Sequence, residues 1–202
     1  MPNNPVELNY EVFLSNNRTW WDYYGEYRYS IDLMFRGMRG GEVTAVSLPL
    51  AFLIRHCLEL GYKANILTLA KLQQKDIKIS YKGKQAHDIK TLHQQFVKLM
   101  SELFKQYSVD KKVINEFNAY NRSLEKLSTT IYKLDEFSYS FRYPVKNDSV
   151  TKNFEKTHYS EDLTINFKEI KELYDSSTLL LMYSTDVVAE FVHPNQLEEI
   201  NY

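Results

Sequence analysis

Residues 47–72 read SLPLAFLIRHCLELGYKANILTLAKL, and this stretch decides the fold. Apolar residues occupy almost the whole circumference of a helix at its start, which is typical of a helix that is buried on all sides. Ser47 is the expected N-cap, Pro49 suits the first turn, and the helix is predicted to continue to about Leu72. We therefore expect a central helix that other helices surround.

Helical periodicity recurs on both sides of this stretch. Four further segments place apolar residues every three to four positions, at about 17–38, 88–104, 110–134 and 166–192. Asp88, Asp110 and Asn166 are the expected N-caps of the last three, and a break is expected near 118–123. The predicted fold class is all-α, a bundle of five or more helices.

Few residues are suited to tight turns, because the chain has only 6 Gly and 5 Pro. A short β-hairpin element is expected at 76–84, where DIKISYKGK alternates apolar and polar residues. Residues 136–163 are predicted to form an extended segment and a mobile loop, and residues 1–16 an N-terminal arm. Without repeats or a Gly/Ser linker, we expect a single domain over 1–202.

Composition excludes several classes of protein. The 25 Lys and Arg balance 26 Asp and Glu, so the chain is no polybasic nucleic-acid binder. Cys57 is the single cysteine, which excludes an intramolecular disulfide and indicates a reducing, cytoplasmic location. The N-terminus lacks the apolar core of a signal peptide, and the longest uncharged run, 43–54, is too short for a membrane span, which needs about 20 residues.

Motifs that bind cofactors are missing from the sequence. No HxxxH, HExxH or cysteine pair suits a metal ion, and no GxxxxGK[ST] or GxGxxG suits a nucleotide. We therefore expect no cofactor. Cys57 lies within the apolar helix, where a thiol is expected to pack rather than to act as a nucleophile.

Charged side chains interrupt the most apolar helix. Arg55, Glu59 and Lys63 follow one another at intervals of four residues, so they share a helix face and an Arg55–Glu59 pair is expected. Buried charges are costly unless they are paired. Two interpretations remain open: an internal salt bridge that positions helices, or a cleft wall where Arg55, His56 and Glu59 contact a phosphate or a partner.

Two further residues are candidates for the same site. His87 precedes the third predicted helix, whose dipole favours a neutral imidazole; it is interpreted either as a proton acceptor or as a structural hydrogen-bonding group. Arg142 lies in the segment FSYSFRYP, whose part SFRYP is expected to lie across the central helix, so that Arg142 shares Glu59 with Arg55. The candidate binding residues are therefore Arg55, Glu59, His87 and Arg142.

Three segments of the chain resemble HEPN-fold proteins, the helical bundles of toxin–antitoxin, abortive-infection and other conflict systems. These segments are PLAFLIRHCLELGYKA (49–64), HDIKTL (87–92) and SFRYP (140–144). The resemblance implies a HEPN-like bundle that often dimerises and, in active members, metal-independent RNA cleavage by an R-x(4–6)-H motif. None of the seven arginines has a histidine five to seven positions later, so that motif is absent.

Three functions follow as hypotheses. The first is a HEPN-like interaction protein of a bacterial or phage conflict system, which binds a protein or RNA partner without catalysis. The second is a metal-independent endoribonuclease with Arg55, His56 and His87 as catalytic candidates. The third is a nucleotide-sensing module that binds phosphate through Arg55 and Arg142. The 16 Tyr, 11 Phe and 2 Trp also favour a homodimer, because Tyr and Trp are enriched in interface cores.

Overall fold

The computed structural model describes residues 12, 14–38, 42–79, 84–136, 138–143, 145–146, 156–157 and 162–192. Within this part the chain forms five α-helices and one short 3-10 helix: α1 (Trp20–Gly37), α2 (Glu42–Leu72), η1 (Lys84–His87), α3 (Ile89–Gln106), α4 (Lys111–Leu134) and α5 (Phe167–Ala189). Two strands of two residues each, β1 (Val145–Lys146) and β2 (Lys156–Thr157), pair antiparallel. The predicted all-α bundle is confirmed.

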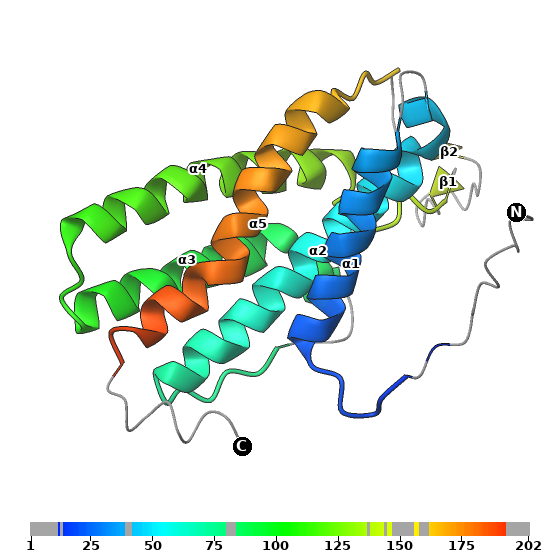
Figure 1. The fold of residues 1–202 in the computed structure, drawn as a ribbon. Helices are drawn as coiled ribbons and strands as arrows, with labels where there is room; N and C mark the ends of the chain where they lie inside the picture. The colour runs from blue at the N-terminus through cyan, green and yellow to red at the C-terminus, as the bar shows by residue number, and fades with distance from the viewer. Residues whose placement is uncertain are drawn as a thin grey trace, which may run out of the picture.

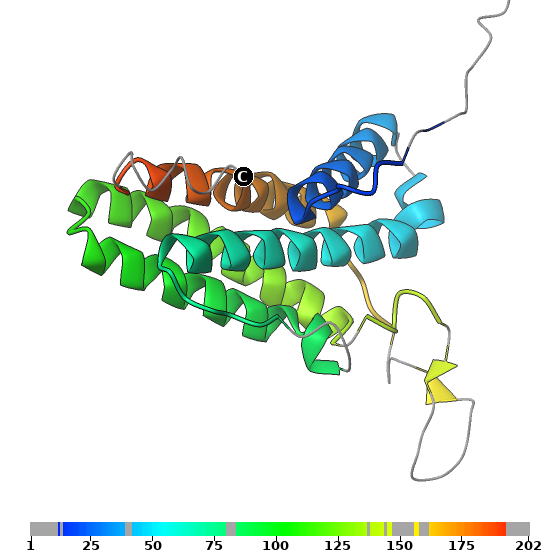
Figure 2. The ribbon, with the colours of Figure 1, turned by 90° about the horizontal axis from the view of Figure 1, so that it is seen from below.

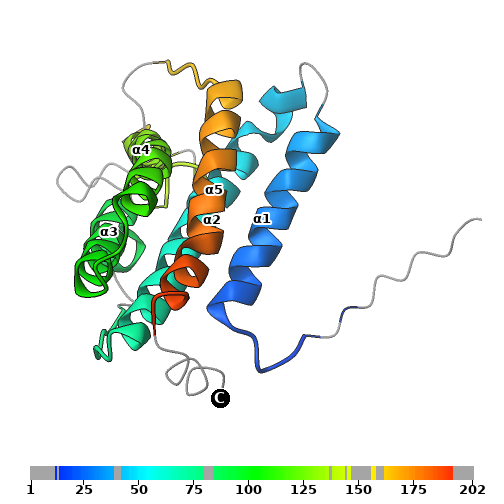
Figure 3. The ribbon, with the colours of Figure 1, turned by 60° about the vertical axis from the view of Figure 1, so that its left-hand side comes forward.

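Helix α2 lies at the centre of the bundle. It packs against α1, α3 and α5, while α4 packs against α3 and α5 (Figure 1). Figure 2 shows that α1 runs antiparallel to α2, and α3 antiparallel to α4. In Figure 3 the helices form three layers, with α1 on one side, α2 and α5 in the middle, and α3 and α4 on the other side. Within the described residues, α2 is the one helix with the length and apolar composition to cross a membrane.

Polar caps fix where most of the helices begin. The side chains of Asp88, Asp110 and Asn166 accept hydrogen bonds from backbone amides in the first turns of α3, α4 and α5, as predicted. Thr19 and Asp22 form a reciprocal capping box at the start of α1. These ends are set by local sequence.

Two helix predictions were wrong because tertiary packing overrides local signals. Helix α2 begins at Glu42, so Ser47 is no N-cap; its Oγ donates to the Thr44 carbonyl within the helix, and Val43 packs against the core. Helix α4 continues through 118–123 without a break. Its apolar stripe remains in register there, because Tyr120 packs against the core one turn before the buried Leu124.

The predicted β-hairpin at 76–84 is not confirmed. Residues 75–79 form no strand, and residues 80–83 lie outside the described residues. Ile77 and Ile79 instead pack against the helical core, so the alternation of apolar and polar residues reflects packing of a loop and not pairing of strands.

The predicted extended segment at 136–163 is partly a turn. Residues 139–142 form this turn, in which the amides of Arg142 and Tyr143 both donate to the Tyr139 carbonyl at 3.0 Å. Within 136–163 the structure describes residues 136, 138–143, 145–146, 156–157 and 162–163, and the others lie outside the described residues. Residues 1–11 and 13 of the predicted arm also lie outside them.

Helices α1, α2 and α5 approach closely at Gly61. A Cβ at this position would lie 2.8 Å from the ring of Tyr24 in α1 and 3.0 Å from Leu181 in α5. The Tyr24 hydroxyl donates to the Thr178 carbonyl at 3.4 Å, and Asn65 Nδ2 donates to the Leu181 carbonyl at 2.8 Å. Glycine is therefore required at the point where the three helices meet.

Candidate functional site

The guanidinium of Arg55 is fully buried and bound on all sides. Its Nε donates to the Asp135 carbonyl at 3.0 Å, and its Nη2 donates to the carbonyls of His87 at 2.6 Å and Glu136 at 3.2 Å. Its Nη1 lies 3.4 Å from Glu59 Oε2, which confirms the predicted pair. The side chain is 0% exposed. Arg55 therefore joins the middle of α2 to the end of α4 and the start of α3.

Asp135 connects this arginine to the turn that follows α4. It is the C-cap residue of α4, where the helix dipole is negative, so a cation such as Arg55 is favoured there. Its Oδ2 lies 3.9 Å from Arg55 Nε, and its Oδ1 accepts the amides of Tyr139 at 2.8 Å and Ser140 at 3.0 Å. The same carboxylate thus faces Arg55 and shapes the turn at 138–143.

Glu59 is the shared acceptor of three cationic or polar groups. Its oxygens lie 2.7 Å from Lys63 Nζ, 3.0 and 3.2 Å from His87 Nδ1, and 3.4 Å from Arg55 Nη1. Burial raises the pKa of Glu59, but the hydrogen bond and charge of Lys63, with the charge of His87, bring the pKa below its usual value. We call Arg55, Glu59, Lys63, His87 and Asp135 the Arg55 network.

His87 is the part of the Arg55 network that reaches solvent. Its side chain is 44% exposed, although Nδ1 contacts Glu59 and its backbone carbonyl accepts from Arg55. The remaining side chains of the network are 0–4% exposed. A molecule at this surface can therefore reach His87 but not the guanidinium of Arg55.

His56 lies on a different side of α2 and contacts rings instead of charges. Its imidazole stacks on Phe52, with 5.9 Å between centroids and planes 3° apart, and meets Tyr27 of α1 edge-on at 4.6 Å. Burial is the main cause that lowers the pKa of His56, so the neutral form is favoured. Of the three catalytic candidates, His56 is the one that shares no hydrogen bond with the other two among the described residues.

Arg142 extends this line of rings onto the surface. Its Cζ lies 5.6 Å from the ring centroid of Phe52, 5.3 Å from that of Tyr139 and 5.4 Å from that of Tyr143. Its Nε donates to the Ser138 carbonyl at 2.5 Å. Arg142 is exposed, and both tyrosines are 50% exposed. We call Tyr27, His56, Phe52, Arg142, Tyr139 and Tyr143 the arginine–aromatic row.

The structure brings Arg142 near Arg55 without the expected contact to Glu59. Burial is the main cause that lowers the pKa of Arg55, Asp135 and Glu59 raise it, and the charge of Arg142 lowers it slightly. The two arginines are linked through Asp135, which contacts Arg55 and holds the turn that carries Arg142. Within the described part of the chain, Glu59 contacts Arg55, Lys63 and His87, so the predicted sharing of Glu59 with Arg142 was wrong. The aromatic rings take the place of the carboxylate.

Sequence reasoning missed the residues that depend on long-range contacts. Asp135 contacts Arg55, which lies 80 positions away in the sequence, and no local motif predicts this contact. Phe52 and Tyr27 read as ordinary helix residues. The aromatic spacing of Tyr139 and Tyr143 around Arg142 was the one available signal, because a turn brings i and i+4 together.

No site for a metal ion is evident in the part of the chain that the structure describes, since no three His, Cys, Asp or Glu side chains gather there. Comparisons with models of protein families, with curated proteins and with solved structures found no match to this chain. The resemblance to HEPN proteins therefore rests on the sequence segments alone.

Proposed function

We propose that this chain is a non-catalytic, HEPN-like interaction protein of a bacterial or phage conflict system, and that it binds a protein partner through the arginine–aromatic row. The observation that carries the proposal is the contrast between two arginines. Arg55 is buried and donates to backbone carbonyls, whereas Arg142 is exposed and lies over aromatic rings. The first supports structure, and the second is free to meet a partner.

The geometry around Arg55 supports binding over RNA cleavage. Acid–base cleavage needs a proton acceptor within hydrogen-bond reach of the substrate and a cation that stabilises the developing charge. Arg55 is 0% exposed, and His56 is packed between Tyr27 and Phe52. His87 is partly exposed, but its Nδ1 already contacts Glu59. These three candidates do not present a common face to a substrate.

The composition of the row favours a protein over a nucleic acid as the partner. Arginine and tyrosine are enriched among the residues that carry most of the binding energy in protein interfaces. Binding to a nucleic-acid backbone instead relies on several phosphate contacts and a basic surface. The row has one permanent cation, Arg142, and the chain has a net charge of -1. A partner with a carboxylate or a carbonyl beside an apolar surface fits this row.

Photocrosslinking in the native host cells tests the proposal. p-Benzoylphenylalanine replaces Tyr139 or Tyr143 in the row, and Tyr29 of α1 in a control, since Tyr29 is also exposed and has an arginine, Arg36, over its ring. We expect adducts from positions 139 and 143 that resist nuclease and are lost on protease treatment, and far fewer from position 29. Nuclease-sensitive adducts, or equal yields at all three positions, would contradict a protein partner at the row.

A cleavage assay tests the enzymatic alternative. Purified protein is incubated in EDTA with labelled tRNA and total RNA. We expect no cleavage at any protein concentration. Cleavage that is lost in His56→Ala and His87→Ala, while both variants keep the helical circular dichroism of the original chain, would overturn the non-catalytic assignment.

A further inference from the structure

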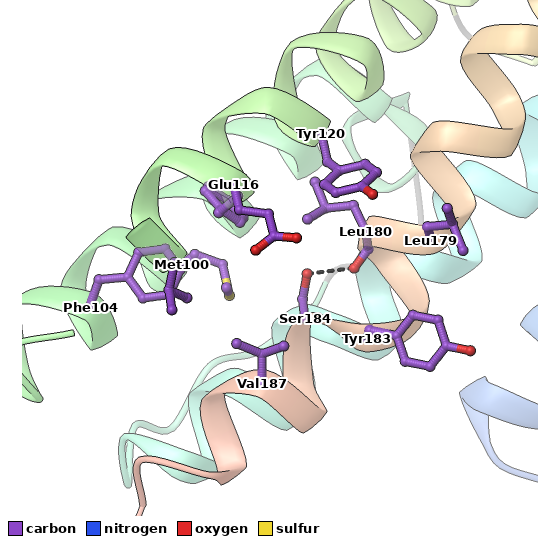
Figure 4. A pocket seen from close by; sticks show the side chains of 11 residues that line it. Met100, Phe104, Glu116, Tyr120, Leu179, Leu180, Tyr183, Ser184 and Val187 are labelled. Atoms are coloured by element: carbon purple, nitrogen blue, oxygen red, sulfur yellow. Dashed lines mark hydrogen bonds between the residues drawn. The ribbon is translucent and has the colours of Figure 1, made fainter. Parts of the chain in front are cut away.

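A separate cavity of about 250 Å³ lies away from the row, toward the opposite end of α4. It is formed by the C-terminal half of α3, the N-terminal half of α4 and the C-terminal half of α5 (Figure 4). Its walls are mostly apolar, with Met100, Phe104, Phe117 and Leu180 buried in the core. The cavity therefore favours an apolar molecule or group.

One charged side chain lines this apolar space. Figure 4 shows the Glu116 carboxylate reaching from α4 across the pocket toward α5. Glu116 has no hydrogen-bond or ion-pair partner among the described residues. The Ser184 hydroxyl donates to the Leu180 carbonyl, and its neutral oxygen is a weaker acceptor of a charged donor than a carboxylate is. The carboxylate is thus the strongest acceptor that the cavity offers to a ligand.

Two tyrosine rings also line the cavity. Tyr120 lies on the same helix as Glu116, one turn away, and the half-exposed Tyr183 lies on α5. Ring faces attract cations, as the carboxylate does. A ligand with a positive charge is therefore favoured by both kinds of group, and an anionic ligand is repelled by Glu116.

The size of the cavity limits the apolar part of the ligand. An apolar cavity of about 150 Å³ can hold one benzene molecule, and the pockets of drug-sized ligands measure roughly 300–1,000 Å³. A volume of about 250 Å³ lies between these limits and suits one ring with a short side chain.

We propose that this cavity binds a small amphiphilic amine, with its ring or short alkyl chain among the apolar residues and its cationic nitrogen at Glu116. The cavity is separate from the row, so this binding does not depend on the function proposed above. Leu179 and Tyr183 at the cavity are 46% and 51% exposed, and a second copy of the chain that covered them would compete with the ligand.

Three probes of similar shape and different charge test the proposal: phenethylamine (cationic), 2-phenylethanol (neutral) and phenylacetate (anionic). Binding is measured by NMR from the ε-methyl signal of Met100, which lines the cavity and is assigned with Met100→Leu. We expect phenethylamine to bind most tightly and phenylacetate most weakly. Equal binding of cation and anion, or a Met100 signal that none of the probes shifts because the cavity is closed or covered, would overturn the proposal.

Glu116→Gln isolates the role of the charge, and Glu172→Gln on the exposed part of α5 is the matched control. Because Glu116 is exposed, the substitution leaves the packed core intact. We expect Glu116→Gln to weaken phenethylamine binding about three- to fivefold and to leave 2-phenylethanol binding within about twofold. Glu172→Gln is expected to leave both unchanged. An equal effect of the two substitutions on phenethylamine would rule out a specific contact with Glu116.

Discussion

Nη2 of Arg55 lies 2.6 Å from the backbone carbonyl oxygen of His87, 32 positions along the chain. The same nitrogen donates to the Glu136 carbonyl, so one group of a single side chain connects α2 with the residues before α3 and after α4. Carbonyls at such ends lack helical partners, and an arginine can satisfy several at once because its donors diverge. Arg55 thereby holds together three segments that are distant in sequence.

Removal of Arg55 is predicted to be severely destabilising. Arg55→Ala leaves three carbonyls without this donor and the buried Glu59 without one of its cations. We expect the free energy of unfolding in urea to fall by about 3–5 kcal/mol. Arg36→Ala, at an exposed position of α1, is the control and is expected to change it by less than about 0.5 kcal/mol. A loss below about 1 kcal/mol for Arg55→Ala would contradict the structural role.

Glu59 is predicted to make stability depend on acid pH. Its folded-state pKa lies below the ordinary value of 4.5, so the unfolded chain binds more protons in the interval between the two values. The stabilisation is complete above pH 4.5 and is lost as the pH falls through the lower, folded pKa.

The comparison of the original chain with Glu59→Gln tests this dependence. The variant is expected to be less stable at pH 7 and to lose less further stability between pH 5 and pH 3. Urea unfolding at a series of pH values measures both effects. If the free energy of unfolding falls equally steeply with decreasing pH in the two proteins, other carboxylates cause the dependence on acid pH.

Two glycines within helices are predicted to respond in opposite ways to alanine. Gly61→Ala places a Cβ 2.8 Å from the Tyr24 ring, and such overpacking costs about 1–3 kcal/mol, more than the helix propensity of alanine recovers. Gly25→Ala meets no atom within 4 Å and is expected to stabilise by about 0.5–1 kcal/mol. Thermal unfolding of both variants provides the measurement. Stabilisation by Gly61→Ala would show that α1, α2 and α5 do not pack this closely.

Local signals in the sequence were sufficient for most helices but not for their tertiary roles. The caps at Asp88, Asp110 and Asn166 depend on amides two or three positions away, so sequence reasoning can locate them. The start of α2 depends instead on the packing of Val43 against other helices. The alternation at Ile77 and Ile79 has the period of a strand, yet these side chains pack against helices.

The candidate site was predictable to the same extent. The Arg55–Glu59 pair follows from their spacing of four residues on one helix. The contacts of Arg142 do not, because a turn held by Asp135 places it against Phe52, and nothing local specifies that approach. The sequence suggested a salt bridge between Arg142 and Glu59. In the structure Arg142 instead lies over the rings of Phe52, Tyr139 and Tyr143.

The division of roles between Arg55 and Arg142 is tested by one paired measurement on Arg142→Gln. The photocrosslinking yield from p-benzoylphenylalanine at position 139 is determined per folded molecule, and the Tm is measured on the same preparation. Arg36→Gln is the control, because Arg36 is also exposed and lies over a tyrosine ring. Because Arg142 is exposed and its hydrogen bond lies within one turn, we expect the Tm to change by less than about 2 °C while the yield falls at least about fivefold. A fall of several degrees in Tm with an unchanged yield per folded molecule would instead make Arg142 a structural residue and contradict its role in partner binding.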